Sequence, residues 1–238
     1  FPDVGWYAAV ETYYRKFDNV TTNNFADNPN DDFDDLLRGY GVSYGGDAVI
    51  RKDRGKLRGF ITASWLRATR TFPDFLAPQV TPESPTPNVS YPPLFDRRFE
   101  LDMVVRVDLP KGWEGGFRWN LGTGLPYTRP IGSYMYFDYR LSDGRLTTDD
   151  RPDSTSVAVL LQERNRSRYP AYHRLDFSAR KEFHKRWGTL TPHVDILNIY
   201  NRKNVLFYFY DYNRNPPIRG GASMFPFIPT IGAEFKFR

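Results

Sequence analysis

Hydrophobic and polar residues alternate one by one along much of this chain. The clearest run extends from Phe99 to Leu109, where apolar side chains occupy positions 99, 101, 103, 105, 107 and 109 and charged ones occupy 100, 102, 106 and 108. Successive side chains of a β-strand point to opposite faces of a sheet. An alternation of period two over eleven residues therefore predicts a strand with one apolar and one polar face.

Seven other segments show the same alternation, less regularly toward the N-terminus. They are residues 6–16, 37–51, 57–65, 113–121, 174–183, 190–196 and 227–237. The pattern of residues 190–196 is compatible with a continuation over 205–212. We therefore expect an all-β chain with about eight strands.

Short and long connections alternate between these segments. The short ones are residues 52–55, 110–112 and 184–187, and the long polar ones are 18–35, 71–96, 126–168 and roughly 213–223. Outer-membrane barrels have short periplasmic turns and long extracellular loops. The alternation therefore predicts antiparallel transmembrane strands of an outer-membrane β-barrel, with every long loop at the cell surface.

The composition agrees with strands better than with membrane helices. Aromatic residues make up 17% of the chain and charged residues 26%. No run approaches the roughly 18 uninterrupted apolar residues that a membrane helix requires. A soluble β-sandwich that binds carbohydrate through its aromatic residues would show the same alternation, and it remains an alternative.

Tyrosine and phenylalanine gather near the ends of the expected strands. The two groups are Tyr134, Tyr136, Phe137 and Tyr139, and Phe207, Tyr208, Phe209, Tyr210 and Tyr212. Aromatic rings of this kind favour the membrane interface, where the ring is apolar and the hydroxyl stays wet. Aromatic residues also favour strands in general, so both interpretations stay open.

Cysteine is absent, which excludes disulfides, thiolate metal ligands and a cysteine nucleophile. The net charge is +5, but basic residues are spread over many segments beside acidic ones. A nucleic-acid interface needs a contiguous basic patch. We therefore expect no nucleic-acid partner.

Several motifs then show a resemblance to a known family. One stretch has Asp96-Arg97-Arg98 before a strand, a turn at Gly112-Trp113, and Gly122-Thr123-Gly124-Leu125-Pro126-Tyr127. A second is the run from Arg168 to Asp176, followed by Asp195-Ile196-Leu197-Asn198-Ile199-Tyr200-Asn201 with Asn204 close behind. The ending from Pro226 to Phe237 contains Pro229-Thr230-Ile231-Gly232. In this order and spacing they resemble the late barrel strands of TonB-dependent outer-membrane receptors.

The resemblance implies a fold and an activity. Barrels of that family have 22 strands around an N-terminal plug, so residues 1–238 are expected to be a C-terminal β-barrel region without the plug, part of a larger barrel. The implied function is energy-coupled uptake of a scarce nutrient, such as an iron chelate, a cobalamin, a sugar or a peptide. The alternative is a small structural or adhesive outer-membrane barrel without transport activity. One departure is Arg238, which follows the aromatic Phe237 expected at the end.

The resemblance also implies partners and a location. These are the lipid of the bacterial outer membrane, a small-molecule ligand at the extracellular loops, and a TonB-type energy-coupling protein that acts through the plug absent from this chain. Loops around Phe25, Phe72, Tyr134 and Tyr208 are expected to contribute to ligand capture, and individual ligand residues are unknown.

We expect no enzyme activity. The three histidines, His173, His184 and His193, are the only side chains suited to acid–base work at neutral pH, and no nucleophile motif frames Ser178 or any other serine. Gly122-Thr123-Gly124 lacks the third glycine and the lysine of a phosphate-binding loop, so it is interpreted as the exit of a strand.

Two loop segments complete the expectations. The acidic residues between 27 and 35 offer oxygen ligands for calcium but lack the spacing of a calcium loop. A solvated surface loop is the favoured interpretation there, and calcium binding stays open. Residues 81–93 contain five prolines, which predicts a stiff extended loop. We expect no cofactor and no metal centre.

Overall fold

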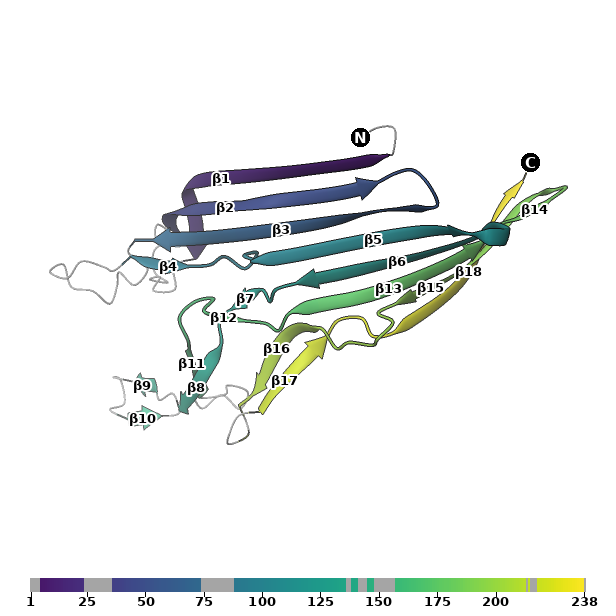
Figure 1. Ribbon diagram of the computed structural model, residues 1–238. Coiled ribbons are helices and arrows are strands. Elements are labelled where there is room, and N and C mark those ends of the chain that lie inside the picture. The colour runs from purple at the N-terminus through teal and green to yellow at the C-terminus, as the bar shows by residue number, and fades with distance from the viewer. Residues whose placement is uncertain are drawn as a thin grey trace.

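The computed structural model describes residues 5–23, 36–73, 88–135, 138–140, 145–147, 157–212, 214 and 218–237. These residues form an all-β structure with antiparallel strands (Figure 1). Among them, no helix is long and apolar enough to cross a membrane.

Eight long strands make one sheet in which neighbours in sequence are neighbours in space. They are β1 (Trp6–Asn23), β2 (Leu36–Lys52), β3 (Leu57–Phe72), β5 (Phe99–Leu109), β6 (Trp113–Gly122), β13 (Tyr172–Lys181), β15 (Gly188–Leu197) and β18 (Ile228–Phe237). The eight predicted strands are therefore confirmed, as is the alternation of short and long connections. Figure 1 shows the strand ends that lead into the long connections at one end of the sheet, and the short turns with the start of β1 and the end of β18 at the other. These are called below the loop end and the turn end.

Short strands extend the sheet or form hairpins at the loop end. β4 (Val89–Tyr91) pairs with β3, and β14 (Phe183–Lys185) pairs with β15. The hairpin pairs are β7 (Pro126–Tyr127) with β12 (Ser167–Arg168), β8 (Pro130–Met135) with β11 (Val157–Leu161), β9 (Asp138–Arg140) with β10 (Arg145–Thr147), and β16 (Val205–Asp211) with β17 (Ile218–Ser223). A 3₁₀ turn, Pro110–Gly112, joins β5 to β6.

Several predicted boundaries were wrong. Residues 205–212 do not continue the strand before them, because Asn198 and Asn201 adopt left-handed conformations with φ of 54° and 52° that break it. They form a separate hairpin with residues inside the predicted loop 213–223. The predicted loop 126–168 likewise contains short strands. His184 lies in β14 and not in a turn, because its strand pairs back onto Gly188 and Thr189.

The pairing register sorts the side chains of the eight strands into two faces. In the centre of the sheet, Met103 pairs with Ile61 on β3 and with Trp119 on β6, while Asp102 pairs with Thr62 and Asn120. The first set belongs to an apolar face that continues to the sheet edges, through Ile50 and Ala8 on one side. The second set belongs to a polar face. The register therefore aligns the alternating apolar and polar positions of neighbouring strands, so that each kind forms one face of the sheet.

The sheet is open. Within the described part of the chain, β1 and β18 are each paired on one side only and do not pair with each other. A closed barrel is therefore not observed among the described residues, and the finding is an open antiparallel sheet. The antiparallel order and the strand number agree with the prediction.

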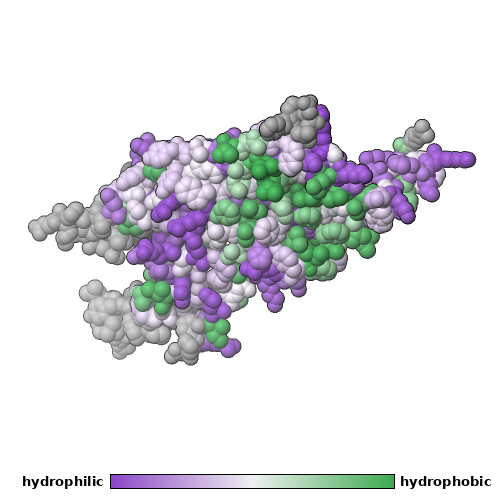
Figure 2. All heavy atoms as spheres, viewed as in Figure 1, coloured by the Kyte–Doolittle hydropathy of each residue, from purple (hydrophilic) through white to green (hydrophobic). Residues whose placement is uncertain are grey.

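This sheet has almost no buried core. Among the described residues, Ala68, Phe72 and Tyr91 are the buried hydrophobic side chains, whereas more than thirty large hydrophobic side chains are exposed. Figure 2 shows hydrophobic residues gathered in a band across the strands, with hydrophilic residues toward the turn end and toward the loop end.

Candidate functional site

Charged side chains form a ladder along the polar face of the sheet. Arg58 on β3 pairs with Asp108 on β5 at 2.5 Å, and Glu114 on β6 receives both Arg106 on β5 at 2.8 Å and Arg180 on β13 at 2.7 Å. The remaining steps are Arg118 with Asp102 at 3.9 Å and Arg174 with Asp176 at 2.9 Å. These pairs form within a strand or between adjacent strands.

Two adjoining hollows open along this ladder. One of about 380 Å³ is lined by residues of β5, β6, β13, β15 and β18, including Arg118 and Asp176. The other, of about 300 Å³, is bordered by Arg106, Glu114 and Arg180 together with His193 and Glu234. The walls of the first hollow are mainly apolar and those of the second mainly polar. The second hollow and the charged ladder beside it therefore suit contact with water or with a polar partner.

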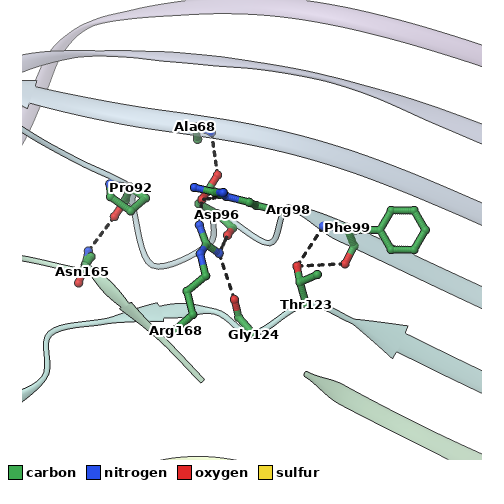
Figure 3. A network of polar contacts seen from close by, with 9 residues as sticks. All are labelled: Ala68, Pro92, Asp96, Arg98, Phe99, Thr123, Gly124, Asn165 and Arg168. Atoms are coloured by element: carbon green, nitrogen blue, oxygen red, sulfur yellow. Dashed lines mark hydrogen bonds and ion pairs between the residues drawn. The ribbon is translucent and has the colours of Figure 1, made fainter. Parts of the chain in front are cut away.

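A buried carboxylate joins three segments at the loop end. Asp96 is 1% exposed, and its Oδ1 accepts a hydrogen bond from the backbone N–H of Ala68 at 2.8 Å. Its Oδ2 pairs closely with the guanidinium of Arg168, which also donates to the carbonyl oxygens of Asp96 and Gly124. Figure 3 shows Asp96 between β3 and the segment that carries Gly124. The motif residues 96 and 168 therefore hold separate connections together.

Glycine is required at position 124 by this close approach. A Cβ there would collide with the backbone carbonyl of Tyr169. Nearby, Thr123 closes the exit of β6, since its N–H donates to the carbonyl of Phe99 at 2.8 Å and its Oγ1 accepts from the N–H of Phe99 at 3.0 Å. The interpretation of residues 122–124 as the exit of a strand is thus confirmed.

Two buried asparagines hold the turn after β15. Asn198 is fully buried, and its side-chain amide donates to the carbonyls of Arg202 and Phe225, while its backbone N–H donates to Asp176. Asn204 exchanges hydrogen bonds with both backbone groups of His173. The asparagines of the resembling motif therefore act as structural connectors between β13, β15 and the loop end.

A cluster of tyrosines lies at the loop end. The rings of Tyr127 and Tyr169 stack at 4.3 Å between centroids, and Tyr208 lies 5.6 Å from the first and 5.3 Å from the second. The guanidinium of Arg219 lies 4.5 Å from the Tyr208 ring centre. The cluster joins the β7–β12 pair to the β16–β17 hairpin, and it places aromatic faces beside a cation.

Burial raises the pKa of the Tyr127 phenol above its ordinary value of 10.0, and the neighbouring phenols of Tyr210 and Tyr208 add to this effect. Burial also raises the pKa of Tyr169. An ionised phenol loses hydration in such a place. These hydroxyls therefore remain neutral hydrogen-bond donors over the physiological pH range.

The three histidines lie in separate places. His173 contacts Tyr200 at 2.9 Å near the loop end, and His184 contacts Thr189 at 3.2 Å near the turn end. His193 shares a hollow with Ser178 and Asp195, and its Nε2 lies 3.8 Å from the Asp195 carboxylate. No hydrogen bond joins His193 to Ser178 within the described residues, so the arrangement lacks the nucleophile–base contact of a triad. The absence of enzyme activity stays a prediction.

The four residues around which ligand-capture loops were expected differ in their surroundings. Phe72 is 0% exposed and stacks on Tyr91 at 5.6 Å, because β4 pairs beside the end of β3 and covers the ring. The Phe72 side chain is therefore covered by the protein itself, and the contribution of the loop around it to ligand capture stays a prediction. Tyr134 is exposed on β8, and Tyr208 belongs to the tyrosine cluster. Phe25 lies outside the described residues.

The acidic segment 27–35 and residues 81–87 of the proline-rich segment also lie outside the described residues. In the part of the chain that is described, no three histidine or carboxylate side chains come together in a way that would hold a metal ion.

Sequence reasoning missed the tyrosine cluster and the burial of Asp96. The cluster combines residues 127, 169 and 208, whose proximity depends on how the connections fold. A sequence signal did exist for Asp96, since it begins one of the motifs that resemble the receptor family.

Comparison of the chain with protein-family models, with curated proteins and with solved structures gave no match.

Proposed function

We propose that this chain supplies membrane-spanning strands of a bacterial outer-membrane barrel, as part of a receptor that takes up a scarce nutrient with energy from a TonB-type partner. The main observation in support of membrane-spanning strands is the exposed apolar face of the sheet. Half-exposed side chains such as Ile61, Trp65 and Phe117 each lack about 1 kcal/mol of the stabilising free energy that full burial would give. A dozen of them forgo on the order of 10 kcal/mol, which is comparable to the whole stability of a typical domain.

The dimensions and the second face support the same proposal. β5, β6, β13, β15 and β18 have 10 or 11 residues, the length of a tilted transmembrane strand. The opposite face carries the charged ladder, as expected for a barrel interior that meets water or a polar domain.

Aromatic and basic side chains at the turn end fit the adjoining lipid headgroups. On the apolar face, Lys52 pairs in register with Trp6 and its Nζ lies 5.4 Å from that ring centre. Lys181 and Trp113 repeat the arrangement at 5.1 Å. Aromatic rings and lysines at this depth bridge the hydrocarbon layer and the headgroup phosphates. The membrane would therefore lie between these pairs and the loop end.

Site-directed spin labelling tests the membrane proposal directly. The chain contains no cysteine, so no native cysteine has to be removed before labelling. Single cysteines on β5 can therefore be placed at the odd positions 101, 103, 105 and 107 and at the even positions 102, 104 and 106. In reconstituted lipid, we expect the odd positions to be accessible to oxygen and the even positions to a water-soluble relaxation agent. Equal accessibility at odd and even positions, or a protein recovered in the soluble fraction, would contradict the proposal.

The transport part has its own measurement, the intact mass of the protein in its native membrane fraction. A mass several-fold above 27.8 kDa would support a receptor with further strands and a plug. A mass close to 27.8 kDa would favour the alternative, a small structural or adhesive barrel.

A further inference from the structure

A hollow of about 370 Å³ lies between two hairpins at the loop end. It is lined by residues 129–132 of the β7–β8 segment and by Tyr210, Tyr212 and Arg219 of the β16–β17 hairpin. Its volume falls within the range of small-molecule sites in proteins. It lies apart from the hollows of the charged ladder and shares no lining residue with them.

The charged side chains that line this hollow are all positive. Two guanidinium groups, those of Arg129 and Arg219, border it, and none of its seven lining residues carries a carboxylate. The nearest carboxylate in sequence, that of Asp211, lies 3.4 Å from Arg214. Elsewhere in the sheet, by contrast, arginines such as Arg58 and Arg180 are matched by carboxylates. The hollow therefore concentrates positive charge without a counter-charge of its own.

The other lining groups supply aromatic ring faces. Tyr210 and Tyr212 stand nearly parallel, with ring centres 6.1 Å apart and planes 20° from each other. The Tyr210 hydroxyl is shielded from solvent and interacts with the phenol of Tyr127 in the tyrosine cluster. Tyr210 therefore offers the hollow its ring face.

We propose that this hollow binds an anionic small molecule that carries carboxylate or phosphate groups on a planar ring. The guanidinium groups pair with the anionic groups through two parallel hydrogen bonds each, which is the geometry that arginine favours. The ring of the ligand lies against the ring of Tyr210 or Tyr212. The inference deepens the proposed function and rests on it for access of this end to the external medium.

Calorimetry on the complete chain in lipid nanodiscs tests the site with three probes. They are trimellitate, which has a ring and three carboxylates, citrate, which has carboxylates and no ring, and benzyl alcohol, which has a ring and no charge. We expect saturable trimellitate binding that is tighter than citrate binding, and no saturable binding of benzyl alcohol.

Variants separate the proposed contacts. The double substitution Arg129→Gln with Arg219→Gln should weaken trimellitate binding at least about tenfold, since a charge-assisted pair contributes more than 1.4 kcal/mol. Tyr212→Ala should weaken it about threefold or more by removing one aromatic ring face from the hollow. Arg166→Gln is the matched control, because Arg166 is an exposed arginine outside the hollow that pairs with Glu163, and it should leave binding within twofold of the original.

Two results would overturn the site. One is the absence of saturable trimellitate binding, and the other is binding that the double variant leaves unchanged, in either case with the oxygen accessibility of β5 still alternating. Loss of that alternation in the unmodified chain would contradict the membrane proposal instead. Trimellitate binding that depends on both arginines would support the site even then.

Discussion

Asp96 and Arg168 illustrate how single residues organise the loop end. Both belong to motifs that carry the family resemblance, and their contacts are structural, since the carboxylate accepts a hydrogen bond from the backbone of β3 and the guanidinium donates to the carbonyl of Gly124. The same holds for Asn198, whose amide closes the turn after β15. These residues hold the connections of the loop end together.

Asp96→Ala should destabilise the fold by roughly 3–5 kcal/mol, because it leaves the partly buried guanidinium of Arg168 without its counter-charge. Urea unfolding in detergent measures this free energy. Arg166→Ala is the control, since Arg166 and Glu163 are 69% and 76% exposed and their pair should contribute about 0–1 kcal/mol. Equal effects of the two substitutions would refute the structural role of Asp96.

The tyrosine cluster should make stability fall at alkaline pH. The pKa of Tyr127 and that of Tyr169 are raised by burial above 10.0, so the unfolded phenols lose their protons first. The stabilising contribution is fully present below pH 10.0 and is lost as the pH rises through the folded pKa values. Tyrosinate absorbance of the folded chain should show a late step whose amplitude Tyr127→Phe lowers. Tyr134→Phe, outside the cluster, is the control, and a late step of unchanged amplitude in Tyr127→Phe would contradict this assignment.

At the scale of elements, the alternation along each strand becomes two chemically distinct faces of one sheet. Neighbouring positions on a strand therefore have opposite environments. Val104 and Val105 on β5 are identical residues on the polar and the apolar face respectively, since the first pairs with Arg118 and the second with Phe117. They offer a matched comparison, because the two residues are of the same type and adjacent on the same strand.

Val105→Arg should cost about 2–4 kcal/mol in a reconstituted membrane, because it places a charge against lipid near the middle of a strand. Val104→Arg should cost much less, since the polar face tolerates charge. Reversible unfolding from lipid vesicles gives both free energies. A cost well under 1 kcal/mol at position 105, or a larger cost at 104, would show that the apolar face does not meet lipid.

At the scale of the whole molecule, the sheet has an exposed apolar face and two unpaired edges within the described residues. Unpaired edges and exposed hydrophobic faces both promote association in water. The molecule therefore needs further structure around it, which the proposed membrane and additional strands would provide.

The protein should consequently aggregate in water and fold in detergent micelles. Size-exclusion chromatography with circular dichroism, with and without detergent, tests this expectation. A monodisperse, β-folded protein in water without detergent would instead support the soluble sandwich that the alternation also allows.

The sequence by itself determined the strands, their two faces, their antiparallel order and the alternation of turns and loops. These properties follow from local rules, because side-chain direction has period two and short connections can join only adjacent antiparallel strands. Only the tertiary structure decided that Phe72 is covered by Tyr91, that Asp96 meets Arg168, and that the tyrosines 127, 169 and 208 meet. Those contacts depend on strand register and on the path of long connections, which residues far apart in sequence determine together.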